Sequence, residues 1–437
     1  MTVINDPVRE YAQLLLKHHE LDPRGDRGVP ELDAVSEAMD GPWKRMDGRQ
    51  RRRMRGFSED LYALADGRRA IPMSTEDRAQ WAARGTAALQ AGDLDVYLDH
   101  LRQPYPEGFP AEIIPALQAW AWNRLGLPEA ALLFYQEAGK VLPMGKVYAM
   151  DCLRRLGRIQ EAREVAEQLL TEPQSRRGQI YQASSTLILL ALEQPSGVRS
   201  QIFEMIVEPL RHVIEAERKI PLASRQDRDL EKDAACALTL ALITLNRLGE
   251  AREVCDDALK CYPDDPELLL ARGAVNLSNN PNAAEADFTR AVEVQAQYSL
   301  PYAVLALFRA NQRNYADTLA LASQAMRFPD LPDETRGLLF EMRGIALAEL
   351  KQPRDRVEEE FARARTLNPT SASRIEHNRE VAMKSLESNS AATPRAEWNL
   401  PSLEPALSQL RASLIHEIAT SPFPEESYSE LLAASTS

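Results

Sequence analysis

Residues that could do chemistry are scattered along this 437-residue chain and form no catalytic motif. His377 and Glu380 stand three residues apart, a spacing used in metal-binding helical bundles, but no second pair of this kind occurs. No GxSxG, Walker-type, GxGxxG or HExxH sequence is present. The four cysteines show no CxxC spacing and stand among Ala and Leu, which indicates buried, reduced thiols: Cys152, Cys236, Cys255 and Cys261. We therefore predict that the protein is not an enzyme and has neither a cofactor nor a metal.

A basic stretch near the N-terminus, "KRMDGRQRRRMRG", could neutralise phosphates from one helix. Residues 1–72 nevertheless hold thirteen basic and thirteen acidic residues, so this segment has no net charge. A docking patch for an acidic protein surface, including the chain's own repeats, is therefore favoured over nucleic-acid binding. The basic patch comprises Arg49, Arg51, Arg52, Arg53 and Arg55.

The composition is typical of helices packed on helices. Hydrophobic residues make up 44% of the chain and aromatic residues only 6%, so Ala and Leu supply most of the apolar content. The net charge of -13 lies outside residues 1–72, and an acidic body disfavours nucleic acid. The longest apolar run, 185–192, is too short to span a bilayer, and the N-terminus lacks the apolar core of a secretory signal. We expect no membrane association and a cytoplasmic location.

A degenerate repeat must position any binding residues. Its template is a small residue, a bulky one four positions later, a small one three later and a proline five later, as in Ala131, Tyr135, Ala138. Those spacings place the side chains on one helical face, where small residues let two helices approach and the bulky one fills the gap. "RLG" at 124–126, 155–157 and 247–249 predicts a preceding helix that ends at a left-handed glycine. Further repeat-packing residues are Ala251, Cys255, Ala258, Phe288, Ala291, Phe361 and Ala364.

The third template position recurs at 138, 169, 258, 291, 325 and 364. Three of the steps, 31, 33 and 34, approach the period of about 34 known for one helical repeat. The pattern resembles the tetratricopeptide repeat family, bacterial type, with degenerate repeats. Trp81, Gly85 and Gly92 are similar to that family's first-helix Trp, Gly and turn positions. The resemblance implies an all-α fold, a right-handed α–α superhelix of helical hairpins, with helical caps at both ends.

The chain is expected to divide into four regions. The repeat solenoid should contain about seven helix pairs, with an irregular pair near 174–220 where one step lengthens to 89. The regions are an N-terminal helical cap (1–72), the solenoid (73–370), a C-terminal capping helix (371–390), and a linker with an amphipathic helix and a mobile tail (391–437).

The two ends carry their own helix signals. Residues 8–19, 30–39 and 47–65 are predicted helices of the N-terminal cap. The C-terminal region holds an apolar stripe at i, i+4, i+7 spacing: Leu403, Leu407, Leu410, Leu414 and Ile418. This amphipathic helix either packs against the last repeat or occupies the chain's own concave groove as an internal ligand.

Polar residues on the predicted first helices are candidate contacts for a partner. They could grip the backbone or the acidic groups of a peptide. Some tetratricopeptide proteins clamp a partner's C-terminal carboxylate with Lys, Asn and Arg from successive repeats, but that Lys–Asn pattern does not recur here. The candidates are Arg272, Asn276 and Arg309, with Asn311 and Arg313 at the following turn.

These features together predict a protein–protein interaction adaptor or scaffold, which binds a protein or peptide partner along the concave face of the solenoid. An alternative is a regulatory subunit, an inhibitor or sensor of an effector enzyme, with the C-terminal amphipathic helix as an internal latch. A third hypothesis is nucleic-acid binding through the basic N-terminal helix.

Overall fold

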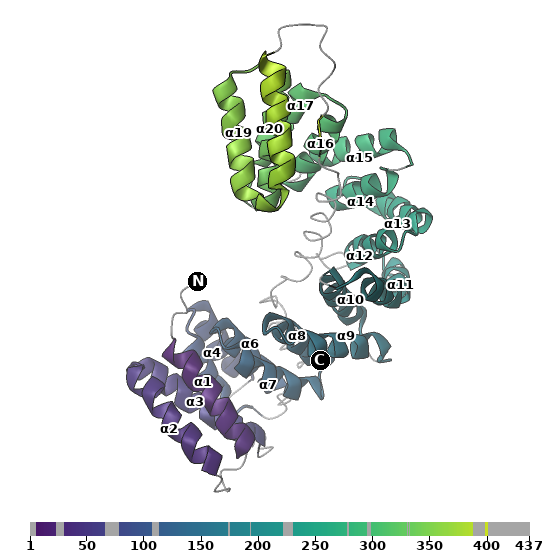
Figure 1. The fold of residues 1–437 in the computed structure, drawn as a ribbon. Helices are drawn as coiled ribbons and strands as arrows, with labels where there is room; N and C mark the ends of the chain where they lie inside the picture. Colours follow the sequence, from purple (N-terminus) through teal and green to yellow (C-terminus); the bar gives the residue numbers. More distant parts are fainter. Residues whose placement is uncertain are drawn as a thin grey trace. The chain divides into compact units, whose positions relative to one another are not determined.

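The computed structural model forms two compact units, each an array of helices (Figure 1). Unit 1 runs to Thr186 and unit 2 begins at Leu187, so the boundary falls inside a helix, α10 (Arg177–Leu192). The structure describes residues 6–22, 30–65, 78–106, 113–173, 175–192, 194–221, 230–277, 279–294, 299–329, 331, 333–387 and 398–400. The predicted amphipathic helix at 403–418 and the tail lie outside these residues.

Unit 1 begins with three helices from the expected cap region and continues into helical hairpins. The helices are α1 (Pro7–Leu21), α2 (Pro30–Arg45), α3 (Gly48–Ala65), α4 (Arg78–Gln90), α5 (Leu94–Leu101), α6 (Ile114–Arg124), α7 (Pro128–Gly139), α8 (Pro143–Arg155) and α9 (Ile159–Thr171).

The described part of unit 2 continues the hairpins, and an additional helix, α20, follows the last of them. Its longest helix is α11, which contains Pro209. The helices are α11 (Ser196–Arg218), α12 (Leu230–Thr244), α13 (Leu248–Cys261), α14 (Pro266–Asn276), α15 (Pro281–Glu293), α16 (Leu300–Asn311), α17 (Tyr315–Ala325), α18 (Asp333–Glu349), α19 (Arg354–Leu367) and α20 (Ala372–Glu387), with a short 3-10 helix, Pro369–Ser371, before the last.

Helices pack on their neighbours in sequence within each unit. In unit 2, every helix from α11 to α19 packs on the next one, and first helices of successive pairs also meet, α12 with α14 and α16 with α18. Stacking of adjacent hairpins is the arrangement of a helical-repeat solenoid. The described ranges contain helices and turns but no β-strand. The predicted all-α, tetratricopeptide-like hairpin fold is confirmed.

The same turn follows the first helix of six hairpins. In each, one residue has a left-handed backbone, and the next residue donates its N–H to the carbonyl five positions back, as Leu127 does to Trp122 at 3.0 Å. This is the Schellman pattern, which satisfies carbonyls that the helix end leaves unpaired. The left-handed residues, with φ between 54° and 78°, are Gly92, Gly126, Gly157, Asn246, Arg313 and Lys351.

The prediction that the third "RLG" ends a helix at its glycine is wrong. Asn246 adopts the left-handed conformation, with φ of 58°, and Gly249 lies in the first turn of α13. Asparagine tolerates this conformation because its short polar side chain can form local hydrogen bonds. The turn therefore needs no glycine at this hairpin.

The predicted C-terminal end of the helix at 30–39 is also wrong, because α2 continues to Arg45 with Pro42 inside it. A proline removes one helical hydrogen bond, but tertiary contacts hold the residues beyond it. Trp43 packs on Tyr11 with ring centroids 5.2 Å apart. Arg51 donates hydrogen bonds to the carbonyl oxygens of Trp43 and Lys44, which closes the C-terminus of the helix.

The N-terminal helices pack directly on repeat helices of unit 1. Helix α3 lies against α5, and α1 lies against α7. Phe57 of α3 is fully buried, and its ring centroid lies 4.9 Å from that of Trp122 on α6. The first repeat helices of this unit therefore have apolar cover.

The repeat-packing residues predicted from the sequence are all buried, with exposed fractions of 0–2%. Two of the aromatic members, Phe288 and Phe361, fit against glycines of the partner helix. A Cβ atom on Gly273 would lie 2.4 Å from the Phe288 ring, and one on Gly344 would lie 2.9 Å from the Phe361 ring. Glycine on one helix therefore makes the room that the aromatic residue of the next one fills.

Gly273→Ala tests this packing. The added methyl group must displace Phe288 or separate α14 from α15, so we expect a loss of about 1–3 kcal/mol in the free energy of unfolding. Gly249→Ala is the matched control, because a Cβ atom added there would have no other atom within 4 Å and alanine favours helix by up to about 1 kcal/mol. Urea unfolding followed by circular dichroism measures both; equal effects would contradict the close contact.

Candidate protein-interaction sites

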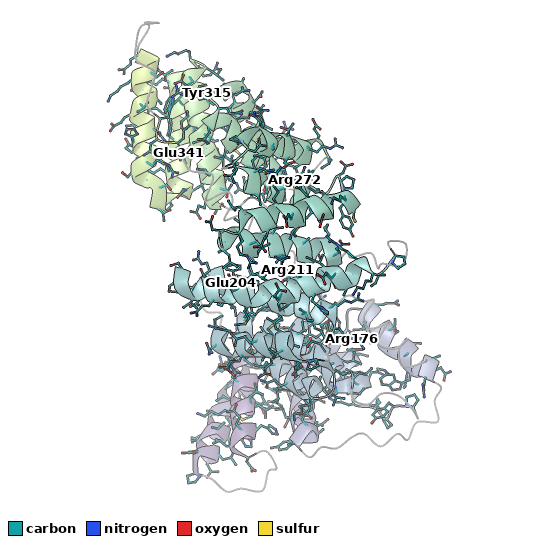
Figure 2. The ribbon with its side chains drawn as sticks, turned by 90° about the vertical axis from the view of Figure 1, so that its right-hand side faces the viewer. Arg176, Glu204, Arg211, Arg272, Tyr315 and Glu341 are labelled. Atoms are coloured by element: carbon teal, nitrogen blue, oxygen red, sulfur yellow. The ribbon has the colours of Figure 1, made fainter. Side chains whose placement is uncertain are left out.

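Two of the predicted partner-binding residues, Arg272 (labelled in Figure 2) and Asn276, meet at one buried carboxylate in unit 2. Arg272 on α14 donates to both oxygens of Asp287 on α15, with the shortest distance 2.6 Å from Nη2 to Oδ1. Asn276, one turn later, donates from Nδ2 to Oδ2 of Asp287 at 3.3 Å. Arg272 also contacts Asp256 on α13 at 3.1 Å. The guanidinium therefore ties three successive helices together.

The other predicted contact residues lie on α16 and its turn. Arg309 forms an ion pair with Glu285 on α15 and a 2.9 Å hydrogen bond with Gln312. Asn311 donates to the carbonyl of Leu307 in its own helix at 2.9 Å. Arg313 occupies the left-handed turn position, with φ of 62°. A partner role for the five residues stays a prediction, and the geometry gives Arg272 and Asn276 a role inside the array.

We expect Arg272→Ala to destabilise unit 2 by about 2–3 kcal/mol, near the lower end for a buried pair because the arginine is 27% exposed. The loss arises because the carboxylate of Asp287, only 7% exposed, would be left with the amide of Asn276 as its partner among the described contacts. Arg290→Ala is the comparison: its pair with Asp264 is about half exposed and should contribute under about 1 kcal/mol. Urea unfolding measures the free energy of unfolding of both variants. Similar, small losses in the two variants would argue against a structural role of Arg272 inside the array.

The basic patch of α3 faces helix α5 within unit 1. Arg53 and Arg49 both bond to the carboxylate of Asp95, at 2.6 Å and 2.5 Å, and Arg49 also reaches Asp93 at 2.8 Å. Burial alone would raise the pKa of Asp95, but these two hydrogen-bonded arginines outweigh it and hold the pKa below its usual value. Two of the five arginines are thus engaged with an acidic repeat helix of the same chain.

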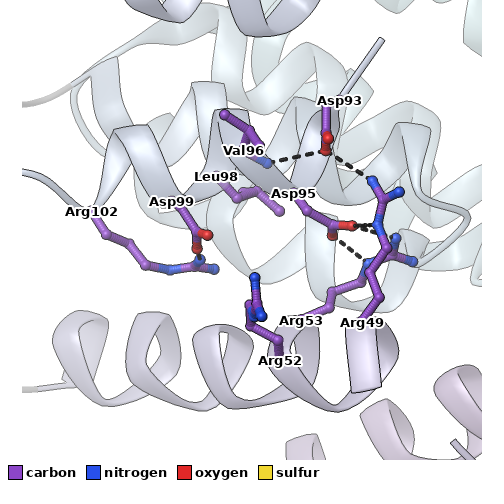
Figure 3. A pocket seen from close by; sticks show the side chains of 9 residues that line it. All are labelled: Arg49, Arg52, Arg53, Asp93, Asp95, Val96, Leu98, Asp99 and Arg102. Atoms are coloured by element: carbon purple, nitrogen blue, oxygen red, sulfur yellow. Dashed lines mark hydrogen bonds and ion pairs between the residues drawn. The ribbon is translucent and has the colours of Figure 1, made fainter. Parts of the chain in front are cut away.

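The remaining arginines of the patch have other surroundings. The guanidinium groups of Arg51 and Arg55 lie 5.9 Å and 5.5 Å from the centroid of the Trp43 ring, within cation–π range. Arg52 is exposed and points into a cavity of about 330 Å³, with no partner among the drawn residues (Figure 3). Val96 and Leu98 add an apolar part to the cavity wall. Binding of an acidic surface by this patch stays a prediction.

A buried ion pair closes one side of the same cavity. Arg102 donates to both oxygens of Asp60 at 2.9 Å and 2.8 Å, and Gln118 adds a third hydrogen bond at 3.0 Å. A Cβ atom on Gly56 would lie 2.5 Å from the guanidinium, so the glycine makes room for it. Burial raises the pKa of Asp60 to about 6 despite its bonds to Arg102.

His100 on α5 is the buried histidine of this region. Its ring packs on Trp81 with centroids 4.2 Å apart. Burial first, and the positive charge of Arg84 second, lower the pKa of His100 to about 4. The ring is therefore neutral at physiological pH, and it packs as an apolar group.

Below pH 6.5 the unfolded chain takes up a proton at His100 before the folded one does. This histidine's contribution to stability is therefore complete above about pH 6.5 and is lost as the pH falls toward 4. We expect the wild type to lose about 1–2 kcal/mol more than His100→Phe between pH 7 and pH 5. Urea unfolding followed by tryptophan fluorescence measures the free energy of unfolding of both proteins at each pH. Titration of Asp60 affects both proteins equally, so it cancels in the difference between them. Parallel pH profiles of the two proteins would contradict the prediction.

A third group of polar residues lies on α18 and α20 and was not found from the sequence. Asn378 on α20 is fully buried and donates to Oε1 of Glu341 on α18 at 2.8 Å. Glu341, also fully buried and labelled in Figure 2, accepts two hydrogen bonds from Arg374 at 3.2 Å and 2.8 Å. With Glu349, which also lies on α18, we call this group the Asn378 clamp: Glu341, Glu349, Arg374 and Asn378.

The Asn378 clamp holds a segment that returns from beyond the end of α20. The N–H of Asn399 donates to Oδ1 of Asn378, and the carbonyl of Asn399 accepts from Nδ2, both at 2.9 Å. Trp398 donates its indole N–H to Glu349 at 2.9 Å. The side-chain amide of Asn378 therefore binds both main-chain groups of Asn399. The carboxylate of Glu349 binds the side chain of the preceding residue, Trp398. His377 and Glu380, the spaced pair considered for metal, flank Asn378 on the same helix.

No family model and no curated protein matches the sequence. Among solved structures, a tetratricopeptide repeat protein from Parabacteroides merdae is 13% identical, over 62% of this chain and 98% of that one, with a TM-score of 0.42. The Cut9–Hcn1 hetero-tetramer structure is 14% identical, over 100% and 99%, with a TM-score of 0.30. The structure of Naa15/Naa10 bound to HypK-THB is 13% identical, over 98% and 69%, with a TM-score of 0.32.

The hairpins, their repeated Schellman turns and the glycine–aromatic contacts carry the fold assignment in this chain itself. The chain has a tetratricopeptide-like fold of repeated helical hairpins. Its described helices include none that is both long and apolar enough to cross a membrane.

Proposed function

We propose that the protein is a non-catalytic adaptor or scaffold that binds a protein partner through an extended segment of that partner. The observation that carries this proposal is the Asn378 clamp, in which a fully buried amide holds both main-chain groups of Asn399. Main-chain hydrogen bonds of this kind give affinity for extended peptides, while neighbouring side-chain contacts give specificity.

Contacts between α18 and α20 orient the clamp without any contribution from the segment. Arg374 forms two hydrogen bonds to Glu341, and Glu341 in turn holds one N–H of Asn378. The amide is therefore oriented by its own helices, with its second N–H and its oxygen directed at the segment. A binding group that is already ordered loses little conformational entropy on association.

A regulatory subunit with an internal latch is the second candidate function. The predicted latch, the amphipathic helix at 403–418, lies outside the described residues. Docking of residues 398–400 on the clamp, just before that helix in the chain, supports this candidate, since a segment of the chain itself occupies the position that a partner would need. A cytoplasmic location fits the free cysteines. Cys152, Cys236 and Cys255 are buried as predicted, but the prediction is wrong for Cys261, which is exposed in the last turn of α13.

Affinity purification with the tagged full-length chain, followed by titration of each identified protein in pure form, tests the adaptor role. We expect at least one direct partner. In a chain whose own segment 398–400 is released by Asn399→Pro, Glu349→Ala should weaken that partner about tenfold because the partner loses the hydrogen-bond acceptor beside the clamp. Glu359→Ala, which alters an exposed glutamate on α19, is the matched control and should leave the dissociation constant unchanged. If no identified protein binds the pure chain directly, the adaptor proposal is wrong.

A further inference from the structure

We infer that the Asn378 clamp is an exchangeable site for an extended segment, that residues 398–400 are its resident ligand, and that a partner segment must displace them. This rests on the proposed function and adds the chemistry of the partner. The incoming segment has a residue other than proline at the clamped position and a hydrogen-bond-donating aromatic side chain, such as indole, immediately before it.

Main-chain recognition follows from the two bonds to Asn399. Its N–H and its carbonyl both point to one amide, the geometry that a residue in an extended strand offers to its neighbour. The residue itself is exposed, so the described contacts at this position do not select its side chain. Any residue with an N–H can take its place, and proline cannot.

Side-chain recognition follows from Trp398 and Glu349. Glu349 lies eight residues after Glu341 on α18, about 12 Å further along the helix axis. The half-buried indole of Trp398, the residue before the clamped one, ends in a 2.9 Å hydrogen bond to this carboxylate. Phenylalanine would keep most of the ring but would lose the donor, so the site prefers tryptophan to phenylalanine.

The resident segment is short and closely tethered. Three described residues, 398–400, lie at the clamp, and ten residues separate Trp398 from the end of α20 at Glu387. A short tether gives an intramolecular ligand an effective concentration in the millimolar range. A free segment with the same contacts therefore binds weakly until the resident is displaced or disabled, which makes the clamp a gate on partner binding.

The experiment is a fluorescence-anisotropy titration of the full-length chain with a labelled peptide of residues 395–403, RAEWNLPSL. Three chains are compared: wild type, Asn399→Pro and Asn399→Ala. Both variants lose the exposed side chain, but only Asn399→Pro loses the N–H that the clamp accepts. Both changes lie at the exposed Asn399, outside the helices, and circular dichroism checks that the folds are equal.

We expect the Asn399→Pro chain to bind the peptide at least tenfold more tightly than the wild type, and the Asn399→Ala chain to behave like the wild type. A peptide with proline at the position of Asn399 should not bind, and one with phenylalanine at the position of Trp398 should bind more weakly. A Trp398→Phe chain, whose resident lacks the indole donor, should fall between wild type and Asn399→Pro.

Equal affinity of the three chains for the peptide, equal binding of the proline peptide, or no binding to the Asn399→Pro chain would each overturn the exchangeable site. The adaptor proposal fails differently, through the absence of any direct protein partner. A partner that binds wild type and Asn399→Pro equally would keep the adaptor role and remove the gate.

Discussion

Close approach of neighbouring helices at small residues is the constraint on which the rest of this structure depends. A Cβ atom on Gly145 would lie 2.4 Å from the backbone nitrogen of Gly139, so α7 and α8 are nearly in backbone contact. Gly273 and Gly344 provide the same closeness to Phe288 and Phe361 in unit 2. Helices this close have little freedom to slide, and the direction of every side chain at their seam is fixed.

Fixed seams explain why the buried charges are paired across helices. Asp60 meets Arg102, Asp287 meets Arg272, and Glu341 meets Arg374, each pair joining two different helices. Such pairs add little net stability compared with apolar residues of equal size, but a one-residue shift of either helix would leave a charge alone in the interior. They therefore select the alignment of the hairpins, and in the Asn378 clamp the same arrangement also orients an amide toward a segment of chain.

The hairpins were predictable and the polar sites only partly so. The repeat spacing and the small–bulky–small template identify the fold because every hairpin packs its two helices through the same kinds of side chain. The glycines that end the first helices, Gly126 and Gly157, were predicted correctly from the RLG motif. The turn at Asn246 departs from it because an asparagine serves there. Arg272 and Asp287 stand fifteen residues apart, one on each helix of a hairpin, so their register could have suggested the pair. Asn378 gave no signal, because its partner Asn399 follows the end of its own helix and is held through main-chain atoms.

Helix α18 carries a consequence for the synthesis of the protein. Eleven of its seventeen residues are buried, and much of their cover comes from α19 and α20, which follow it in the chain. At a synthesis rate of about 5–20 residues per second, the stretch from Glu349 to Glu387 takes about 2–8 s to complete. For that time an apolar helix leaves the ribosome ahead of the helices that cover it. During that time the face of α18 that will be buried is open to chaperones.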